Sequence, residues 1–248
     1  MKIAIVFGTR PEVIKLYPVI KGLERKHDVK VIWTGQHDKL ASQMIMGFGI
    51  KVQHNLKVMT KNQTLSSLSI KLHEKLGELF DREKFDLVII QGDTTSAMIT
   101  ALEAYYHKIS VGHVEAGLRT DDIYAPFPEE VNRRIITQFA KYNFTPTDNA
   151  SLNVALEGWG EILQTGQTGI DTLLEVAKKI KTYKKKKILI TLHRRENFDK
   201  IGEILGKVMT FLVYHPDWEA IYPVHPNPAI EKAISDANLG SLIKFVEP

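Results

Sequence analysis

Cysteine is missing from the 248-residue chain, and its absence narrows the chemistry that the protein can use. Without thiols there are no disulfides, no cysteine-ligated zinc and no thiol nucleophile. A sequence without disulfides is also compatible with a reducing cytosol. We therefore expect a cytoplasmic protein.

Long hydrophobic runs are lacking as well. The apolar run at residues 1–7 is too short for the core of a signal peptide and is better interpreted as a buried strand. No later run approaches the length of a membrane-spanning helix. The sequence therefore gives no reason to expect contact with a membrane.

Basic residues only slightly outnumber acidic ones, and the formal net charge is +4. This excess suits an anionic small molecule, but no nucleic-acid-binding motif accompanies it, and the aromatic residues are not interleaved with basic ones. The glycine fingerprint of dinucleotide binders is absent, and so is a tight metal-ligand spacing such as H-E-x-x-H. We expect no cofactor, no metal and no nucleic-acid partner.

Short apolar runs rich in branched and aromatic residues alternate with longer stretches of helical period. The strand-like runs of the first part are residues 3–7, 29–34, 87–91, 109–114 and 142–145. The helical stretches between them are residues 10–25, 64–80, 94–106 and 129–140. This alternation predicts an α/β fold with a doubly wound, mostly parallel sheet.

The same alternation restarts after a lysine-rich stretch at residues 184–187, which is typical of a solvated connection. Strand-like runs follow at residues 188–192, 219–222 and 242–246. About sixty residues are too few for an open α/β sheet of normal size. We therefore predict a first domain at residues 1–168 and a partial second domain at residues 169–248.

Polar residues follow the first predicted strand, at residues 8–12. In open α/β sheets ligands bind beyond the carboxyl ends of the strands, and helix N-termini there favour anions. Thr9 and Glu12 have the spacing of a capping box, with Pro11 in the first turn, so helix capping explains them. Capping does not explain Arg10, and Lys15 lies about one turn further along.

Acidic residues follow the later strands. Asp93 is interpreted equally well as a helix N-cap and as a functional side chain at the sheet edge. Glu115 precedes Arg119, so either a charge pair or a ligand contact fits. Glu129 and Glu130 open a helix; capping is favoured for Glu130, whereas Glu129 is the better functional candidate because Pro128 constrains its approach.

The second domain has its own candidates. His193 and the two arginines after it follow a strand, which favours anion binding over a purely structural histidine. The loop at residues 225–228 follows another strand and also contains a histidine. Clefts between domains are favoured ligand sites, and these loops are candidates for facing one.

Seven motifs in order resemble one known family. They are Phe7-Gly8-Thr9-Arg10-Pro11-Glu12, Thr34-Gly35-Gln36-His37, Gly92-Asp93-Thr94-Thr95, Gly112-His113-Val114-Glu115-Ala116-Gly117-Leu118-Arg119-Thr120, Pro126-Phe127-Pro128-Glu129-Glu130-Val131-Asn132-Arg133, Thr165-Gly166-Gln167-Thr168-Gly169-Ile170-Asp171 and His193-Arg194-Arg195-Glu196-Asn197. Together they span nearly the whole chain, and the sequence resembles the non-hydrolysing UDP-N-acetylglucosamine (UDP-GlcNAc) 2-epimerases. The family pattern continues past residue 248, so the chain is expected to lack the family's C-terminal segment.

The resemblance implies two Rossmann-like domains of the GT-B type, the second incomplete, with a nucleotide sugar between them. It implies that Asp93, Glu115 and Glu129 are the acid/base carboxylates and that His193 is a fourth catalytic residue near the diphosphate. The candidates for holding the substrate or the departing UDP are Arg10, Lys15, Arg133 and Arg194. Gln36, His37 and Gln43 are considered for an allosteric site.

The implied reaction is reversible epimerisation of UDP-GlcNAc to UDP-ManNAc through a 2-acetamidoglucal. Three alternatives remain open at this point: a hydrolysing epimerase, a GT-B glycosyltransferase and a non-catalytic fragment that binds a UDP-sugar. Family resemblance also implies a homodimer.

Overall fold

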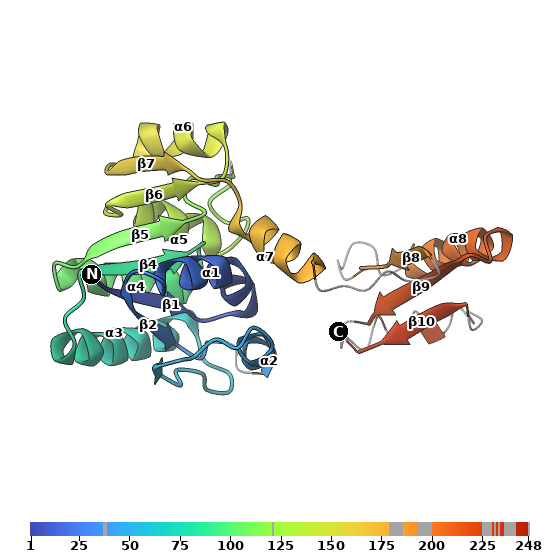
Figure 1. The fold of residues 1–248 in the computed structure, drawn as a ribbon, viewed down its shortest axis with the longest axis horizontal. Helices are drawn as coiled ribbons and strands as arrows, with labels where there is room; N and C mark the ends of the chain where they lie inside the picture. Colours follow the sequence, from blue (N-terminus) through green and yellow to red (C-terminus); the bar gives the residue numbers. More distant parts are fainter. Residues whose placement is uncertain are drawn as a thin grey trace. The chain divides into compact units, whose positions relative to one another are not determined.

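The computed structural model describes residues 1–36, 39–120, 122–178, 186–192, 200–224 and 242–247, together with residues 230, 232, 234 and 235. The chain divides into two compact units, Met1–Lys179 and Ile180–Pro248 (Figure 1). The first unit thus extends past residue 168, the predicted end of the first domain. It does so because helix α7 (Thr168–Ala177) packs against α1 (Arg10–Leu23). The hydroxyl of Thr172 on α7 donates a hydrogen bond to the carbonyl of Ile14 on α1 at 2.7 Å.

The first unit contains a seven-stranded sheet in which all the pairings are parallel. Its strands are β1 (Lys2–Phe7), β2 (Asp28–Trp33), β3 (His54–Asn55), β4 (Leu87–Gln91), β5 (Ser110–Val114), β6 (Tyr142–Thr145) and β7 (Glu161–Gln164). Their order across the sheet is β3-β2-β1-β4-β5-β6-β7. The order therefore reverses between β1 and β4, which creates a topological switch point.

Helices connect these strands, as a parallel sheet requires. Besides α1 and α7 they are α2 (Lys39–Gly47), α3 (Leu65–Arg82), α4 (Thr95–Tyr106), α5 (Glu129–Thr137) and α6 (Asp148–Glu157). All five strand runs and all four helical stretches predicted for the first unit are confirmed, with their ends shifted by at most a few residues. The sequence prediction missed five elements, namely α2, β3, α6, β7 and α7.

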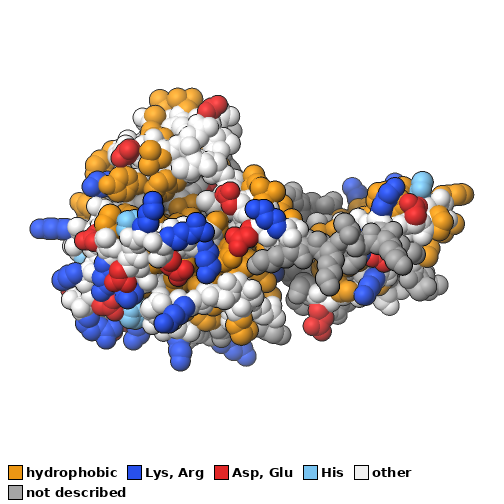
Figure 2. Space-filling view, in the orientation of Figure 1, with side chains coloured by type: hydrophobic (Ala, Val, Ile, Leu, Met, Phe, Trp, Pro, Cys, Tyr) orange, Lys and Arg blue, Asp and Glu red, His pale blue; other side chains and the backbone are white. Residues whose placement is uncertain are grey.

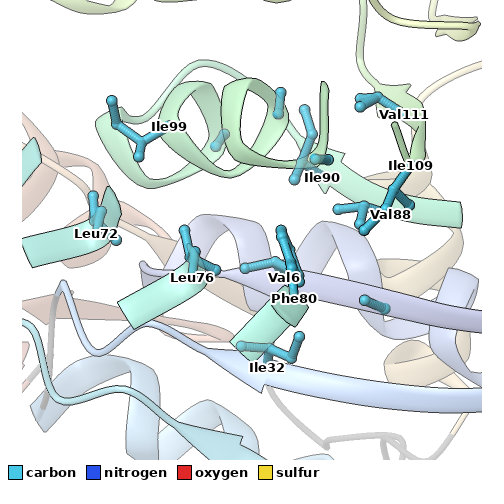
Figure 3. Close-up of a cluster of buried hydrophobic side chains, with 14 of the residues drawn as sticks. Val6, Ile32, Leu72, Leu76, Phe80, Val88, Ile90, Ile99, Ile109 and Val111 are labelled. Atoms are coloured by element: carbon cyan, nitrogen blue, oxygen red, sulfur yellow. The ribbon is translucent and has the colours of Figure 1, made fainter. Parts of the chain in front are cut away.

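Both faces of the sheet are covered, because alternate side chains of each central strand point to opposite sides. From β1, Ala4 and Val6 enter one buried cluster with residues of α3 and α4. Ile3, Ile5 and Phe7 of the same strand enter the other cluster, with α1 and α2. Figure 3 shows the first cluster, in which Val6 faces Leu76 and Phe80 of α3. The central strands are thus buried on both faces, which accounts for their uninterrupted apolar sequences.

The second unit repeats the pattern on a smaller scale. Strands β8 (Lys186–Leu189), β9 (Trp218–Pro223) and β10 (Ile243–Val246) form a parallel sheet in the order β10-β9-β8, with helix α8 (Ile201–Tyr214) between β8 and β9 in the chain. Tyr222 and Leu205 lie in its buried core. The predicted α/β class, with a second and smaller parallel sheet, is confirmed.

The surface agrees with the modest net charge. On the face shown in Figure 2, acidic and basic side chains of the first unit are interspersed and form no field of a single sign. Among the described residues, no helix is both long enough and apolar enough to cross a membrane.

Gly117, just after β5, provides a test of the fold. Its φ is +87°, and a Cβ built there would lie 2.0 Å from the carbonyl oxygen of Ala150 on α6. Gly117→Ala should therefore destabilise the first unit by at least about 3 kcal/mol, from the backbone clash and the left-handed conformation together.

Gly22→Ala is the matched control, since a Cβ at Gly22 on α1 meets no atom within 4 Å. It should be neutral or stabilise by up to about 1 kcal/mol through helix propensity. The two free energies of unfolding come from denaturant titration. Equal effects of the two substitutions would contradict the tight packing at Gly117.

Candidate active site

A pocket of about 740 Å³ lies at the carboxyl ends of β1, β4 and β5. Its charged and polar residues come mainly from the start of α1, the turn after β4, the residue after β5 and the start of α5. The remaining wall is formed by Gln36, Leu40, Met59 and Leu65. This is the sheet edge at the switch point between β1 and β4, where open α/β sheets bind their ligands. The fold therefore forms a pocket at the sheet edge that the sequence analysis singles out.

Five of the predicted site residues line this pocket. They are the three carboxylates Asp93, Glu115 and Glu129 and the two cations Arg10 and Lys15. They come from four separate segments of the chain, and the sheet topology brings them together. Two other candidates, His193 and Arg194, lie outside the described residues, as does His37.

Glu115 is held rigidly. Its backbone has a φ of +66°, a conformation that non-glycine residues rarely adopt and that is found preferentially at functional sites. The ammonium group of Lys15 donates to its carboxylate at 2.7 Å, and the amide of Gln91 donates to it at 3.1 Å. The amide of Gln167 donates to the other oxygen. Lys15 thus neutralises a carboxylate whose side chain is only 7% exposed.

Asp93 follows β4 and is paired with Arg133 of α5, whose Nη2 lies 2.7 Å from Oδ2. Burial raises the pKa of Asp93 above its ordinary value, the Arg133 cation opposes that rise, and the negative charges of Glu129 and Glu115 add to it. The net direction is upward. A carboxyl group shifted in this way keeps its proton to a higher pH than a solvent-exposed aspartic acid, which suits a group that exchanges protons.

Arg133 has a different position from the one the sequence suggests. It is predicted to bind substrate, yet it is not among the residues that line the pocket. Its side chain is 10% exposed and lies behind Asp93, with Nε 3.6 Å from Glu130. Spacing along α5 could not distinguish a guanidinium that faces a ligand from one that faces a carboxylate of the protein.

Two other candidates contact partners within the protein. Glu130 is fully buried and accepts hydrogen bonds from Arg134 at 2.8 Å and from the backbone N–H of Thr120 at 3.1 Å. Arg119 pairs with Glu157 of α6 at 2.7 Å, whereas Glu115 pairs with Lys15, so the charge pair considered between Glu115 and Arg119 does not form. Both residues tie the β5–α5 loop to its surroundings.

Glu12 is a pocket residue that sequence reasoning assigned only to capping. Its carboxylate accepts from the backbone N–H groups of Gly8 at 3.0 Å and Thr9 at 2.7 Å, as the capping box predicts. It also accepts from the hydroxyl of Thr94 at 2.9 Å and lines the pocket. Two N–H groups at the α1 N-terminus are therefore already bound to an internal anion, which weakens the expectation that this terminus holds a phosphate.

The charge of the pocket is informative. Four carboxylates line it, those of Glu12, Asp93, Glu115 and Glu129, against the two cations of Arg10 and Lys15. A lining of this kind repels an anion and favours neutral polar groups or proton transfer. The pocket is therefore suited to acid/base chemistry on an uncharged part of a ligand.

The doubly wound sheet and the pocket at its switch point place the chain among the α/β proteins that bind ligands at the carboxyl edge of a parallel sheet. Residues 21–248 match the UDP-N-acetylglucosamine 2-epimerase family. The chain therefore belongs to that family.

Relatives and solved structures agree with this assignment. A UDP-N-acetylglucosamine 2-epimerase of Campylobacter jejuni is 40% identical, with 94% of this chain and 67% of the relative covered. That of Escherichia coli K12 is 36% identical, with 95% and 68% covered. The UDP-GlcNAc 2-epimerase of Neisseria meningitidis, solved bound to UDP-GlcNAc, superimposes with a TM-score of 0.84 at 35% identity and covers 100% of this chain and 72% of its own. The chain thus spans about two thirds of the length of these relatives.

The burial of Glu12 leads to a prediction about stability and pH. Because burial raises the pKa of Glu12 above 4.5, ionisation opposes folding, so the stabilisation present below 4.5 is lost as the pH rises through the raised pKa. Glu12→Gln lacks this ionisation. The melting temperature of Glu12→Gln minus that of the parent chain should therefore increase from about pH 4 to about pH 8.

Glu78→Gln is the control, since the Glu78 side chain on α3 is 63% exposed and lies outside the pocket. Its melting temperature should follow that of the parent chain across the same pH range. Parallel curves for Glu12→Gln and the parent would show that Glu12 titrates normally and would contradict the burial argument.

Proposed function

We propose that the chain catalyses the reversible epimerisation of UDP-GlcNAc at C2 of the sugar, giving UDP-ManNAc. The observation that carries the proposal is the convergence of Asp93, Glu115 and Glu129 on one pocket at the switch point. Membership of the 2-epimerase family supports the substrate class. A solved relative from Methanocaldococcus jannaschii, with a TM-score of 0.75 at 32% identity, is a complex with UDP-GlcNAc and UDP.

The chemistry follows from the acidity of the substrate. The hydrogen on C2 is not acidic, because its neighbours are an amide nitrogen and carbon rather than a carbonyl. Direct exchange of that proton is therefore unfavourable. We propose an elimination in which a base removes the C2 proton, the C1–O bond to UDP breaks with its electron pair leaving on UDP, and a C1=C2 double bond forms. UDP then adds back to C1 of the 2-acetamidoglucal while a proton is delivered to the opposite face of C2.

Two faces of one carbon require at least two proton-handling groups, and the pocket supplies three carboxylates. Asp93, whose pKa is raised above its ordinary value by burial, is suited to carry a proton in this reaction. Lys15 is paired with Glu115 at 2.7 Å and would hold its carboxylate in place. The elimination and the re-addition leave the oxidation state of the substrate unchanged overall, so the proposed reaction requires no redox cofactor.

The acidic lining of the pocket supports placing the hexose there rather than the diphosphate. An anion as strong as a pyrophosphate would face four carboxylates and two cations. Arg10, which is exposed and lines the pocket, would hold the end of the sugar nearest to UDP. By family resemblance, His193 and Arg194 would contact the diphosphate, and Arg133 is better proposed as the partner of Asp93 than as a substrate ligand.

One assay tests the proposal. The chain is incubated with UDP-GlcNAc in D₂O, and C2 of the sugar is followed by NMR. Appearance of UDP-ManNAc with deuterium at C2 is the expected result. Free ManNAc with UDP would indicate a hydrolysing enzyme, and transfer that depends on an added acceptor would indicate a glycosyltransferase. Binding without exchange would indicate a non-catalytic UDP-sugar-binding protein, and each of these three results contradicts the proposal.

Removing the pocket carboxylates one at a time gives a second prediction. Asp93→Asn, Glu115→Gln and Glu129→Gln preserve shape but remove the acid/base function, so each should lower the rate of deuterium exchange by about 10²–10⁴-fold. Exposed Glu78→Gln is again the control and should exchange at the parent rate. Full activity in any two of the three pocket variants would overturn the assigned chemistry.

A further inference from the structure

The backbone around Asp93 is held by hydrogen bonds to other elements. Gly92 precedes it with a φ of +71°, which allows the chain to turn sharply between β4 and α4. The N–H of Gly92 donates to the carbonyl of Val114 on β5 at 3.0 Å. The carbonyl oxygens of both Gly92 and Asp93 accept hydrogen bonds from side chains on other elements. The peptide units on both sides of the Asp93 α-carbon are thus anchored.

His113 of β5 holds the first carbonyl. Its Nε2 lies 2.7 Å from the oxygen of Gly92, and because a carbonyl can only accept, Nε2 carries the proton. The ring is fully buried, and burial lowers the pKa of His113 to about 4, so it remains neutral near pH 7. Its Nδ1 has no hydrogen-bond partner among the described residues. The only polar contact recorded for this buried ring in the described part of the chain is therefore the one to Gly92.

Asn132 and Arg133 of α5 contact the main-chain carbonyl and the side chain of Asp93. The Nδ2 of Asn132 donates to the carbonyl of Asp93 at 2.8 Å, and Arg133 pairs with the carboxylate of Asp93 at 2.7 Å. Asn132 is 4% exposed and does not line the pocket. Two consecutive residues of one helix thus fix the main chain and the side chain of a single aspartate.

We propose that His113 and Asn132 are positioning residues that fix the orientation of the Asp93 carboxyl group in the pocket. The inference rests on the proposed function, in which Asp93 handles a proton at C2. Neither residue lines the pocket, so each acts through Asp93. Displacing a reacting group by about 1 Å can lower a rate by about 10²-fold, so fixing the backbone of Asp93 bears directly on turnover.

The test uses shape-preserving substitutions. His113→Leu and Asn132→Leu each remove one donor, and each should lower kcat for epimerisation by about 10–100-fold with KM changed by less than about 2-fold. His113→Gln restores an amide donor near the Nε2 position and should recover most of the lost rate. In an Asp93→Asn background the same substitutions should have no further effect, because they act through Asp93.

Asn143→Leu is the matched control. It removes a fully buried amide that donates to the carbonyls of Ala140 and Trp159, away from the pocket. It should lower the melting temperature while leaving kcat within about 2-fold of the parent. Equal losses of kcat in Asn143→Leu and Asn132→Leu would show a general structural effect and would overturn the inference.

A second readout does not require activity. In the chain labelled with ¹³C at the aspartate carboxyl groups, the Asp93 signal is titrated and assigned by its loss in Asp93→Asn. If the side chain is freed toward solvent, the desolvation that raises its pKa is relieved, so the pKa of Asp93 should fall toward its ordinary value in His113→Leu and Asn132→Leu. An unchanged Asp93 titration in both variants overturns the inference.

The two proposals fail separately. If the parent chain shows no exchange at C2, the proposed function fails, and the titration still decides whether His113 and Asn132 position Asp93. If His113→Leu does not fold, Asn132→Leu tests the same prediction from the opposite side of the residue. If exchange occurs and both titrations are unchanged, only the positioning role is wrong.

Discussion

The parallel pairing of β1 with β4 is the constraint on which the rest of the structure depends. Parallel strands end at the same edge of a sheet, and the reversal of strand order at this pair separates the turns that follow, so that a pocket opens between them. Helix α1, which follows β1, brings Glu12 and Lys15, the turn after β4 brings Asp93, and Glu115 directly follows β5. Both faces of these strands are buried, so the strand ends, and the polar residues after them, have little freedom to move.

Keeping several carboxylates around one pocket opposes folding, because burial and mutual repulsion both disfavour the ionised forms. The chain offsets this with internal partners: Lys15 for Glu115, Arg133 for Asp93, and helix N–H groups for Glu12. The compensation is incomplete, since the pKa values of Asp93 and Glu12 are both raised. Carboxyl groups whose ionised forms are only partly stabilised can gain or lose a proton, and a reaction at an unactivated carbon requires such groups.

Apolar strand runs and helical periods were sufficient to predict the central elements of the first unit, because strands buried on both faces leave a clear signal. Three of the missed elements left a weak signal: β3 has two residues, β7 is partly exposed, and α6 has little amphipathic pattern. Asp93 and Glu115 could be singled out because they follow strands, and Glu129 because Pro128 constrains its approach. The direction of the Arg133 side chain could not be predicted, because it depends on how α5 packs against the turn after β4. Glu12 was not recognised as a pocket residue, because helix capping already explained it.

The central claim is that carboxyl groups from separate turns surround the C2 carbon of a hexose. A structure of the chain with UDP-GlcNAc tests it most directly. The account predicts that C2 lies within about 3.5 Å of carboxyl oxygens from at least two of Asp93, Glu115 and Glu129, on opposite faces of the sugar ring. A hexose bound outside this pocket, or with all three carboxylates on the same face, would contradict it.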